Sequence, residues 1–348
     1  MQQLRRFLTF DDVGLIPKFN NIRSRLNVRL ETNITTNIKT SIPFIPANMD
    51  TVIGTELASV IKYYDGIGIF HRFSPIEKRL EWLNDYPDFF QSCGVADWED
   101  TLVLIKAGCK RYCIDIAHGH SIMVGEMIQK IKTNCPDAQV IAGNVCTIEG
   151  FDYLVSVGAD AIKCGVGPGA ACSTRMVTGV GVPQFSAVYE MAKYRDLLNN
   201  KKGKYIPIIA DGGIRDSRDI CLALAAGADT VMMGSIFCKT FESACPKFKD
   251  EDGHIYGKYR GQASANFQNE YFGQVKKGTV PEGIDFTVKI TKSAKEVIEE
   301  FNGALRSSMT YLGASNMEEY HMNAEFFEST MNYLPESKPR KEDVKAKL

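Results

Sequence analysis

Several features that would assign this chain to a broad class are missing from its 348 residues. Lys and Arg (41) balance Asp and Glu (42), so the net charge is -1 and no basic excess predicts nucleic-acid binding. No apolar run reaches the roughly 18 residues that a membrane span needs. The opening MQQLRRFLTFDD acquires two carboxylates before any long apolar stretch, so we expect no signal peptide and a cytoplasmic protein without a membrane partner.

Metal-site and disulfide patterns are also missing. The ten cysteines include no Cys-x-x-Cys pair, and Cys109 and Cys113 lack the second pair that a zinc site requires. His118 and His120 have no further histidine or carboxylate cluster nearby, so they do not predict a metal site. Most cysteines have apolar sequence neighbours, which favours buried free thiols in a reducing compartment.

What the sequence does contain is a recurring unit, a short apolar β-branched run followed by an amphipathic stretch. Several runs are almost continuously hydrophobic, as is typical of parallel strands that are buried on both faces. The expected strands are 43–49, 66–72, 90–96, 111–117, 139–145, 160–167, 205–213 and 229–235. The expected helices are 55–64, 75–86, 99–108, 121–134, 148–158, 185–198, 217–227 and 293–309, and Gly108, Gly158 and Gly227 are placed to end three of them.

Eight strands that alternate with eight helices predict an α/β fold, a single (β/α)8 TIM barrel over residues 1–334. An open doubly wound sheet is the alternative, but no GxGxxG follows the first strand. A long irregular insertion is expected at about 238–290, and the charged segment 335–348 is expected to be disordered. In such a barrel, the catalytic residues lie where the strands end.

The most informative strand end is C-G-V-G-P-G-A-A-C-S-T-R, residues 164–175. Its glycines allow a sharp turn and a close approach to a ligand, and the turn presents Cys172, with Thr174 two residues later. A thiol in this place is a candidate nucleophile, although a buried free cysteine is the more common fate of this residue. Successive carbonyls of the loop could also surround a monovalent cation.

The seventh and eighth expected strands end in A-D-G-G-I-R (210–215) and M-M-G-S (232–235). Loops in these two positions often bind phosphate through backbone N–H groups, which favours Gly212, Gly213, Gly234 and Ser235. Asp211 is then suited to ribose hydroxyls. The alternative is that these glycines are ordinary turn residues.

Three charged residues are less certain. Glu282 lies alone in the insertion, where a solvated carboxylate is the common case, and Arg25 and Arg72 could contact an anionic ligand or simply be surface residues. The residues by themselves therefore predict a barrel enzyme with a phosphate-bearing ligand and a cysteine nucleophile, and they leave the reaction open.

Eight segments together resemble the IMP dehydrogenase/GMP reductase family. They are FDDVGLIP (10–17), PANMDTV (46–52), IDIAHGHS (114–121), AGNV (142–145), PGAACSTRMVTGVGVPQFSAV (168–188), ADGGIR (210–215), VPEG (280–283) and SMTYLGA (308–314). The resemblance implies a TIM barrel that binds a purine 5′-monophosphate and joins its C2 to the cysteine. Dehydrogenases then oxidise IMP to XMP with NAD, whereas reductases expel ammonia from GMP and add hydride from NADPH to give IMP.

Within the family, three features favour a GMP reductase. No pair of accessory cystathionine-β-synthase-type domains fits the chain, and the segments 46–52, 183–188 and 308–314 resemble reductase versions. The Arg-Tyr pair that activates water in dehydrogenases is matched by Glu270–Tyr271. Conversely, VPEGID resembles the dehydrogenase, and Gln262 replaces a usual methionine. A compact IMP dehydrogenase and a non-catalytic purine-nucleotide-binding barrel therefore stay as alternatives.

The resemblance also implies roles for particular residues. Cys172 is the nucleophile, and Thr174 and Glu282 handle the protons of the leaving ammonia. Ribose and phosphate contact Asp211, Gly212, Gly213, Gly234 and Ser235, and the base contacts Gly261, Gln262, Glu282 and Gly283. NADPH contacts Ser24, Arg25, Arg72, Asp115, Ile116, Ala117, Val166 and Gly167. Gly167, Gly169, Cys172 and Arg175 match a site for a monovalent cation, K+. The family also implies a homotetramer in which Tyr311 and Gly313 approach a neighbour's cofactor.

Overall fold

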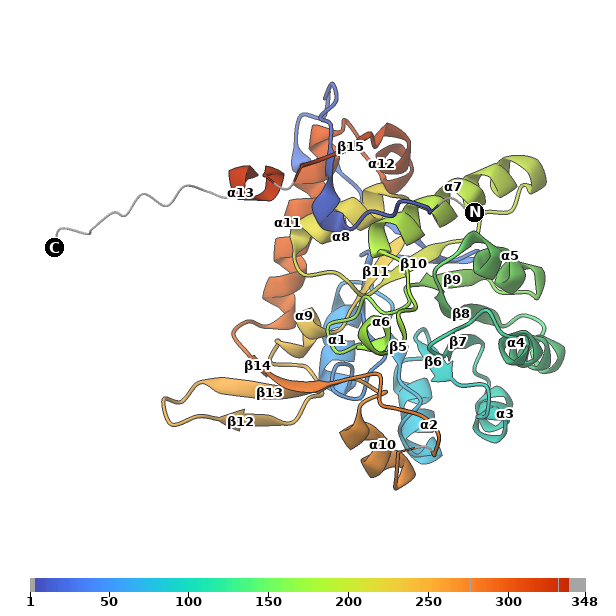
Figure 1. Ribbon diagram of the computed structural model, residues 1–348. Coiled ribbons are helices and arrows are strands. Elements are labelled where there is room, and N and C mark those ends of the chain that lie inside the picture. The colour runs from blue at the N-terminus through green and yellow to red at the C-terminus, as the bar shows by residue number, and fades with distance from the viewer. Residues whose placement is uncertain (1–3, 276, 331, 338–348) are drawn as a thin grey trace.

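The computed structural model describes residues 4–275, 277–330 and 332–337. Its centre is an eight-stranded parallel sheet in the order β4-β11-β10-β9-β8-β7-β6-β5. The eight strands are β4 (Phe44–Pro46), β5 (Ile69–Phe70), β6 (Phe90–Cys93), β7 (Arg111–Asp115), β8 (Gln139–Val145), β9 (Ala161–Cys164), β10 (Ile208–Asp211) and β11 (Thr230–Met233). Because β4 pairs with β11, the sheet curves into a nearly closed barrel with helices around it (Figure 1). The predicted TIM barrel is confirmed.

All eight expected strands and all eight expected helices are present, with ends that differ by a few residues. The main helices around the sheet are α1 (Thr55–Tyr63), α2 (Ile76–Asp85), α3 (Trp98–Lys106), α4 (Ile122–Asn134), α5 (Ile148–Ser156), α7 (Gln184–Lys202), α8 (Ser217–Ala225) and α11 (Ala294–Tyr311). Gly108, Gly158 and Gly227 follow three of them with φ of +91°, +105° and +102°. These positive angles end a helix at no steric cost when the residue is glycine.

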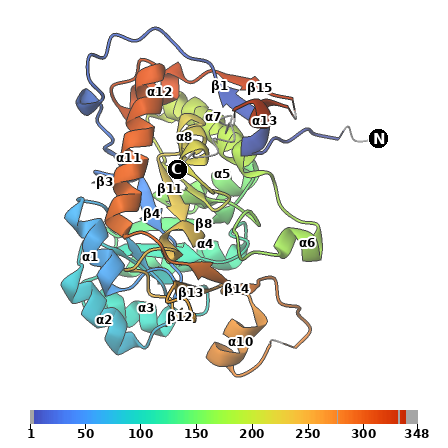
Figure 2. The same cartoon turned by 90° about the vertical axis from the view of Figure 1, so that its left-hand side faces the viewer.

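The insertion at about 238–290 is more regular than expected. The strands β12 (Lys247–Lys249), β13 (Ile255–Arg260) and β14 (Asp285–Lys289) form an antiparallel sheet, and α10 (Ala265–Phe272) lies between the last two. In β13 and β14, apolar residues such as Tyr259 and Val288 alternate with exposed polar ones, which is a period-two pattern. Figure 2 shows this sheet and α10 on one side of the barrel.

Other short elements complete the chain. The hairpin β2 (Thr32–Thr35) and β3 (Ile38–Thr40) closes the amino-terminal end of the barrel, because Thr35 bonds Gln139 at the start of β8. The remaining elements are η1 (Phe10–Asp12), β1 (Val13–Leu15), η2 (Arg25–Asn27), α6 (Thr174–Thr178), α9 (Ser235–Cys238), α12 (Met317–Asn323), β15 (Phe326–Glu328) and α13 (Tyr333–Ser337). Residues 335–337 of the expected tail are therefore helical, and 338–348 lie outside the described residues.

Side chains from the strands and the inner helix faces form one large hydrophobic core. It includes eight of the ten cysteines; Cys146 is half-buried, and Cys172 is the exposed one. None of the described helices combines the length and the apolar character needed to cross a bilayer.

Candidate active site

The loop after β9 presents Cys172 at the carboxyl-terminal end of the barrel. Gly165 and Gly167 have φ of +145° and +81°, which a side chain would strain, so the sequence CGVG turns sharply there. The Cys172 N–H donates to the Gly169 carbonyl at 3.0 Å, which closes the next turn. Cys172 is exposed, and its thiol lies 3.2 Å from the Thr174 hydroxyl at the start of α6. A thiol with a polar neighbour at an open strand end is accessible to a ligand.

Backbone hydrogen bonds attach two further segments to this loop. The Ile284 N–H donates to Ala171 O at 3.0 Å, and the Ser173 N–H donates to Glu282 O at 2.9 Å. The Glu282 N–H in turn donates to Ala263 O at 3.1 Å. The structure thus brings together Cys172, Glu282–Gly283 and the 261–264 turn, although both of the later segments lie more than 85 positions after the cysteine in the sequence.

Arg175 holds the glycine loop from inside. Its Nε donates to Val166 O at 3.0 Å, and its guanidinium also bonds Val182 O. A Cβ on Gly167 or Gly181 would lie 2.6 Å from this side chain, so the packing requires glycine at both positions. Burial lowers the pKa of Arg175. The guanidinium therefore fixes the position of the loop that is predicted to hold K+. In this loop the carbonyl of Gly169 accepts the hydrogen bond from the Cys172 N–H.

The expected phosphate and ribose residues lie beside the cysteine loop. Gly212 and Gly213 have φ of +84° and +78°, and a Cβ on Gly212 would lie 3.1 Å from the Gly169 nitrogen. Gly234 precedes Ser235 at the start of α9, and a Cβ there would overlap the Tyr259 hydroxyl. The two strand ends are also joined, because the Gly212 N–H donates to Met232 O at 3.2 Å.

A buried lysine that the sequence analysis missed lies under this surface. Lys163 of β9 is 2% exposed, and its ammonium lies 2.8 Å from Asp115 Oδ1 and 2.6 Å from Asp211 Oδ2. Asn48 donates to Asp115 and Asn144 donates to Asp211, each at 2.9 Å. Burial opposes ionisation of Asp115, but Lys163 outweighs it and lowers the pKa of this carboxyl. The same pair of carboxylates raises the pKa of Lys163 despite its burial.

One signal in the sequence could have identified Lys163. A lysine within the apolar run DAIKCGVG is unusual, because buried charges are nearly always paired. Its partner Asp115 ends β7 and its partner Asp211 ends β10, and these two strands flank β8 and β9 in the sheet. Only the strand order therefore shows that both carboxylates meet Lys163. The cluster fixes the carboxylates of two residues that the resemblance assigns to cofactor and ribose.

The expected cofactor residues separate into two groups. Arg72 follows β5 and lies at the same end of the barrel as Asp115, which ends β7, and Ile116 and Ala117, which come directly after it. Its guanidinium pairs with Asp97 at 3.0 Å and stacks on the Phe73 ring at 4.2 Å, so its charge is already balanced.

The helix α10 covers this area. Phe267 and Tyr271 place their rings 4.7 and 4.9 Å from that of Phe73. Arg260, which ends β13, connects α10 to the barrel by charge. Its Nε donates to Asp50 Oδ2 at 2.9 Å, and its guanidinium also pairs with Glu270 of α10. Burial raises the pKa of Asp50 even though Arg260 opposes the shift. The insertion is therefore attached to the barrel by aromatic packing and by a charge pair.

Gln262 reaches the barrel directly, since its Nε2 donates to Asn48 O at 2.9 Å. The turn 261–264 thus lies between the cysteine loop and the end of β4.

Ser24 and Arg25 do not join this site within one chain. Ser24 caps η2 through its bond from the Leu26 N–H at 3.3 Å, and both residues are exposed. The segment lies against α11 near the amino-terminal end of the barrel, where the Arg29 N–H donates to Ser315 O at 2.9 Å. Their expected role as contacts to the dinucleotide stays a prediction. The Tyr311 carbonyl accepts from the Lys18 N–H on that same side.

A possible metal cluster lies elsewhere. Asp250, Asp252 and His254 converge at the tip of the β12–β13 hairpin, where all three are at least partly exposed. None of the candidate site residues described above belongs to this cluster.

Together the fold and the site define a TIM-barrel protein with an exposed cysteine on a glycine loop beside a buried Asp–Lys–Asp cluster. The family model described as IMP dehydrogenase / GMP reductase domain matches residues 7–86 and 92–340. The chain belongs to this family, whose members are oxidoreductases that bind purine monophosphates and use nicotinamide cofactors.

Named relatives fall in both branches. The chain is 36% identical to an inosine-5′-monophosphate dehydrogenase of Borreliella burgdorferi, with 95% of this chain and 96% of the relative covered. It is 33% identical to GMP reductase 2 of Bos taurus, with 94% and 96% covered. It is 44% identical to an inosine-5′-monophosphate dehydrogenase of Chlorobaculum parvum, but spans only 48% of that protein and 68% of itself.

Proposed function

We propose that this protein is a GMP reductase that converts GMP to IMP and ammonia with NADPH. The observation that supports this choice is the composition of α10. Its eight residues, ANFQNEYF, include no arginine or lysine, and the Glu270 carboxylate is paired with Arg260. Hydrolysis to XMP needs a base that activates water, and proton transfer of this kind contributes about 10²–10⁴ in rate. Without the arginine that the resemblance assigns to this role, the covalent adduct would be better suited to accept hydride.

The residues on the cysteine loop would carry out the covalent steps. Cys172 Sγ would attack C2 of the purine, and the C2 amino group would leave as ammonia after taking a proton. Thr174, 3.2 Å from the sulfur, and Glu282, hydrogen-bonded through its backbone to Ser173, would supply that proton. NADPH would supply the hydride to C2, after which the thiolate leaves and IMP is released.

The substrate would be held at the adjoining strand ends. Backbone N–H groups at Gly212, Gly213, Gly234 and Ser235 would bind the phosphate. Oδ2 of Asp211 is occupied by Lys163 and Asn144, which leaves Oδ1 for the ribose hydroxyls. Gly261, Gln262 and Gly283 would contact the base.

The residues present fit a nicotinamide ring at the ends of β7 and β8. Asn144 Oδ1 is buried and accepts no hydrogen bond from the described residues, so a carboxamide N–H could donate to it. Asp115, Ile116, Ala117, Val166 and Gly167 would surround the ring, and Arg72 would lie toward the rest of the dinucleotide. In a homotetramer, Ser24 and Arg25 of one subunit would serve the cofactor of another. K+ would bind carbonyls of Gly167, Gly169 and Cys172 near Arg175.

Paired absorbance assays at the NAD(P)H band test this proposal. Purified protein with GMP and NADPH should show loss of absorbance, and Cys172→Ala should abolish it. Thr174→Val should lower kcat by about 10²–10⁴ with little change in KM, because it removes a proton-transfer group and leaves the phosphate site intact. A rise in absorbance with IMP and NAD, and no GMP-dependent loss, would contradict the proposal.

A compact IMP dehydrogenase is the second candidate. It is favoured by the dehydrogenase name of the Borreliella burgdorferi relative, which is covered along 96% of its length. Formation of XMP from IMP and NAD in the same assays would support it. Binding of purine monophosphates without turnover under any cofactor would instead indicate a non-catalytic barrel.

A further inference from the structure

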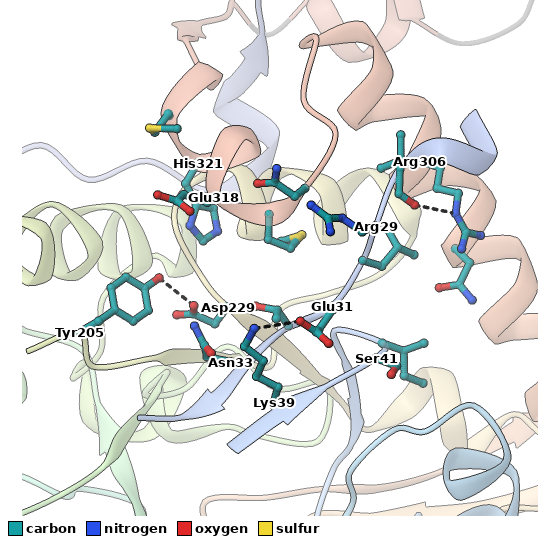
Figure 3. Close-up of a pocket in the computed structure, with 18 of the residues that line it drawn as sticks. Arg29, Glu31, Asn33, Lys39, Ser41, Tyr205, Asp229, Arg306, Glu318 and His321 are labelled. Carbon is teal, nitrogen blue, oxygen red and sulfur yellow. Dashed lines mark hydrogen bonds and ion pairs between the residues drawn. The ribbon is translucent and has the colours of Figure 1, made fainter. Parts of the chain in front are cut away.

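A large cavity at the amino-terminal ends of the strands keeps several of its charged side chains in internal pairs. Its volume is about 1430 Å3, and the lining residues Asp229 and Tyr205 precede β11 and β10. Lys39 pairs with Glu31 at 2.9 Å, and the Tyr205 hydroxyl donates to Asp229 at 2.7 Å (Figure 3). Such pairs hold the cavity wall together and do not by themselves define a ligand.

An ion pair at the opposite, carboxyl-terminal end of the barrel bears directly on the candidate active site. Arg260 ends β13, and its Nε and Nη2 donate to Asp50 Oδ2 at 2.9 and 2.5 Å. Two residues later, Gln262 Nε2 donates to the Asn48 carbonyl at 2.9 Å. The first part of the turn 261–264 is therefore attached to the segment after β4 by two side chains.

The Asp50–Arg260 pair is largely shielded from solvent. The two side chains are 16% and 22% exposed, and burial raises the pKa of Asp50 although Arg260 opposes the shift. Asp50 Oδ1 is buried and has no hydrogen-bond partner among the described residues, so this carboxylate depends on the contacts of Oδ2 with Arg260. Breaking a buried pair is far more costly than breaking an exposed one, because a charge is left without its partner.

Arg260 also contacts the helix α10. Its Cζ lies 5.1 Å from the centre of the Phe267 ring, and its Nη1 pairs with Glu270. One guanidinium therefore contacts the barrel and α10 at once, at the residue that precedes the turn 261–264. A lysine has no such fork of donors and could not make both contacts in the same geometry.

The segment after β4 gives this ion pair a fixed support. The Val52 and Ile53 N–H groups donate to the Met49 carbonyl at 3.0 and 3.1 Å, which closes a tight turn around Asp50. Asn48 is 4% exposed. A group that is bonded to this segment is therefore held in a defined position relative to the strand ends.

The turn 261–264 in turn lies against the cysteine loop. A Cβ on Gly261 would lie 2.7 Å from the Ala171 carbonyl, directly before Cys172. The Gly261 N–H donates to the Ile284 carbonyl at 3.1 Å, and the Ile284 N–H donates to the Ala171 carbonyl at 3.0 Å. A shift of this turn would therefore change its position relative to the nucleophile.

We propose that Arg260 is a positioning residue for the purine base. Its ion pair with Asp50 holds the turn 261–264 at the distance from Cys172 at which the turn meets the base. This role rests on the proposed contact between the turn and the base, and it is independent of whether the bound nucleotide is then reduced or oxidised. Arg260 takes no part in the chemical steps.

Calorimetric titration of the full chain with IMP, without a cofactor, tests this role. Arg260→Met removes the ion pair, and the IMP dissociation constant should rise about tenfold or more, because small displacements of positioning groups have large effects. Arg260→Lys keeps a cation beside Asp50 but lacks the fork, and the constant should rise about threefold. Urea unfolding checks that both variants are folded, and Arg260→Lys carries the test if Arg260→Met is not.

Arg111 provides a matched control. Its side chain is 23% exposed, close to the value for Arg260, and it pairs with Asp88 at 2.7 Å at the start of β7, away from the turn. Arg111→Met should leave the IMP dissociation constant within about twofold of the original. Asp50→Asn should weaken IMP binding by itself but cause no further loss in Arg260→Met, because the two residues act through one pair.

Ribose 5-phosphate separates the positioning of the base from a general loss of structure. It carries the ribose and phosphate of the nucleotide without the base, so its dissociation constant, measured by 31P NMR titration, should change less than about twofold in both Arg260 variants. Unchanged IMP affinity in these variants, or an equal loss for ribose 5-phosphate, would overturn the proposal. If the expected pattern of IMP binding is found but GMP and NADPH do not react, the proposed reaction fails and the role of Arg260 stands.

Discussion

Replacing Lys163 by methionine should destabilise the protein strongly at neutral pH. The ammonium lies 2.8 and 2.6 Å from two carboxylates, and its side chain is 3% exposed. Methionine preserves the volume but leaves Asp115 and Asp211 charged, close together and without a cation. Removing one partner of a buried ion pair costs about 3–5 kcal/mol, which is a large part of a typical 5–15 kcal/mol stability.

The pH dependence of this loss distinguishes electrostatics from packing. Lys163 holds the pKa of Asp115 in the folded protein below its ordinary value. The stability that this ion pair contributes is therefore fully present above the pKa of Asp115 in the unfolded chain. It is lost as the pH falls through the lower pKa of Asp115 in the folded protein. The difference in unfolding free energy between the original and Lys163→Met should therefore be largest well above 3.8, the ordinary pKa of the carboxyl, and shrink as the pH falls below that value.

Urea unfolding followed by circular dichroism at several pH values measures that difference. Adding Asp115→Asn to Lys163→Met should recover part of the loss, because one of the two uncompensated charges is gone. A cost below about 1 kcal/mol at pH 7, or a cost that is the same at every pH, would refute the account of the Asp–Lys–Asp cluster.

Three further predictions follow from other contacts. Gly234→Ala should cost about 1–3 kcal/mol, because its Cβ would overlap the Tyr259 hydroxyl, and Tyr259→Phe should restore part of this in urea unfolding. Glu270→Gln should change stability by less than about 1 kcal/mol, because its pair with Arg260 is exposed; a larger shift in urea midpoint would contradict this. Burial and the nearby positive charge of Arg79 lower the pKa of His71 from 6.5 to about 4. As the pH falls from 6.5 to 4, the unfolded chain therefore binds one more proton than the folded protein, and the free energy of unfolding decreases. His71→Gln should remove about 3 kcal/mol of this decrease, measured by urea unfolding at several pH values.

The sequence by itself determined the barrel and the glycine loop of the candidate site. Apolar runs such as 139–145 and 229–235 and the helical spacing between them are local patterns, and each strand or helix responds to its own residues. Gly108, Gly158 and Gly227 likewise follow from a steric rule that concerns one residue at a time. The glycine loop with Cys172 was identifiable for the same reason.

The period-two pattern of β13 and β14 was also present in the sequence, but it is interrupted by α10. The two strands pair only across the 24 residues from Gly261 to Ile284. The sequence analysis therefore expected an irregular insertion, because no local signal shows which distant segment completes such a sheet.

Tertiary structure alone decided which groups meet. Lys163 meets Asp211 across 48 residues of sequence because β9 and β10 are neighbours in the sheet, and it meets Asp115 because β7, β8 and β9 follow in order. Likewise, only the tertiary structure shows that the segment with Ser24 and Arg25 packs against α11, an element from the other end of the chain. Local propensity acts over a few residues, whereas a site is formed by strand ends whose proximity depends on the order of the whole sheet.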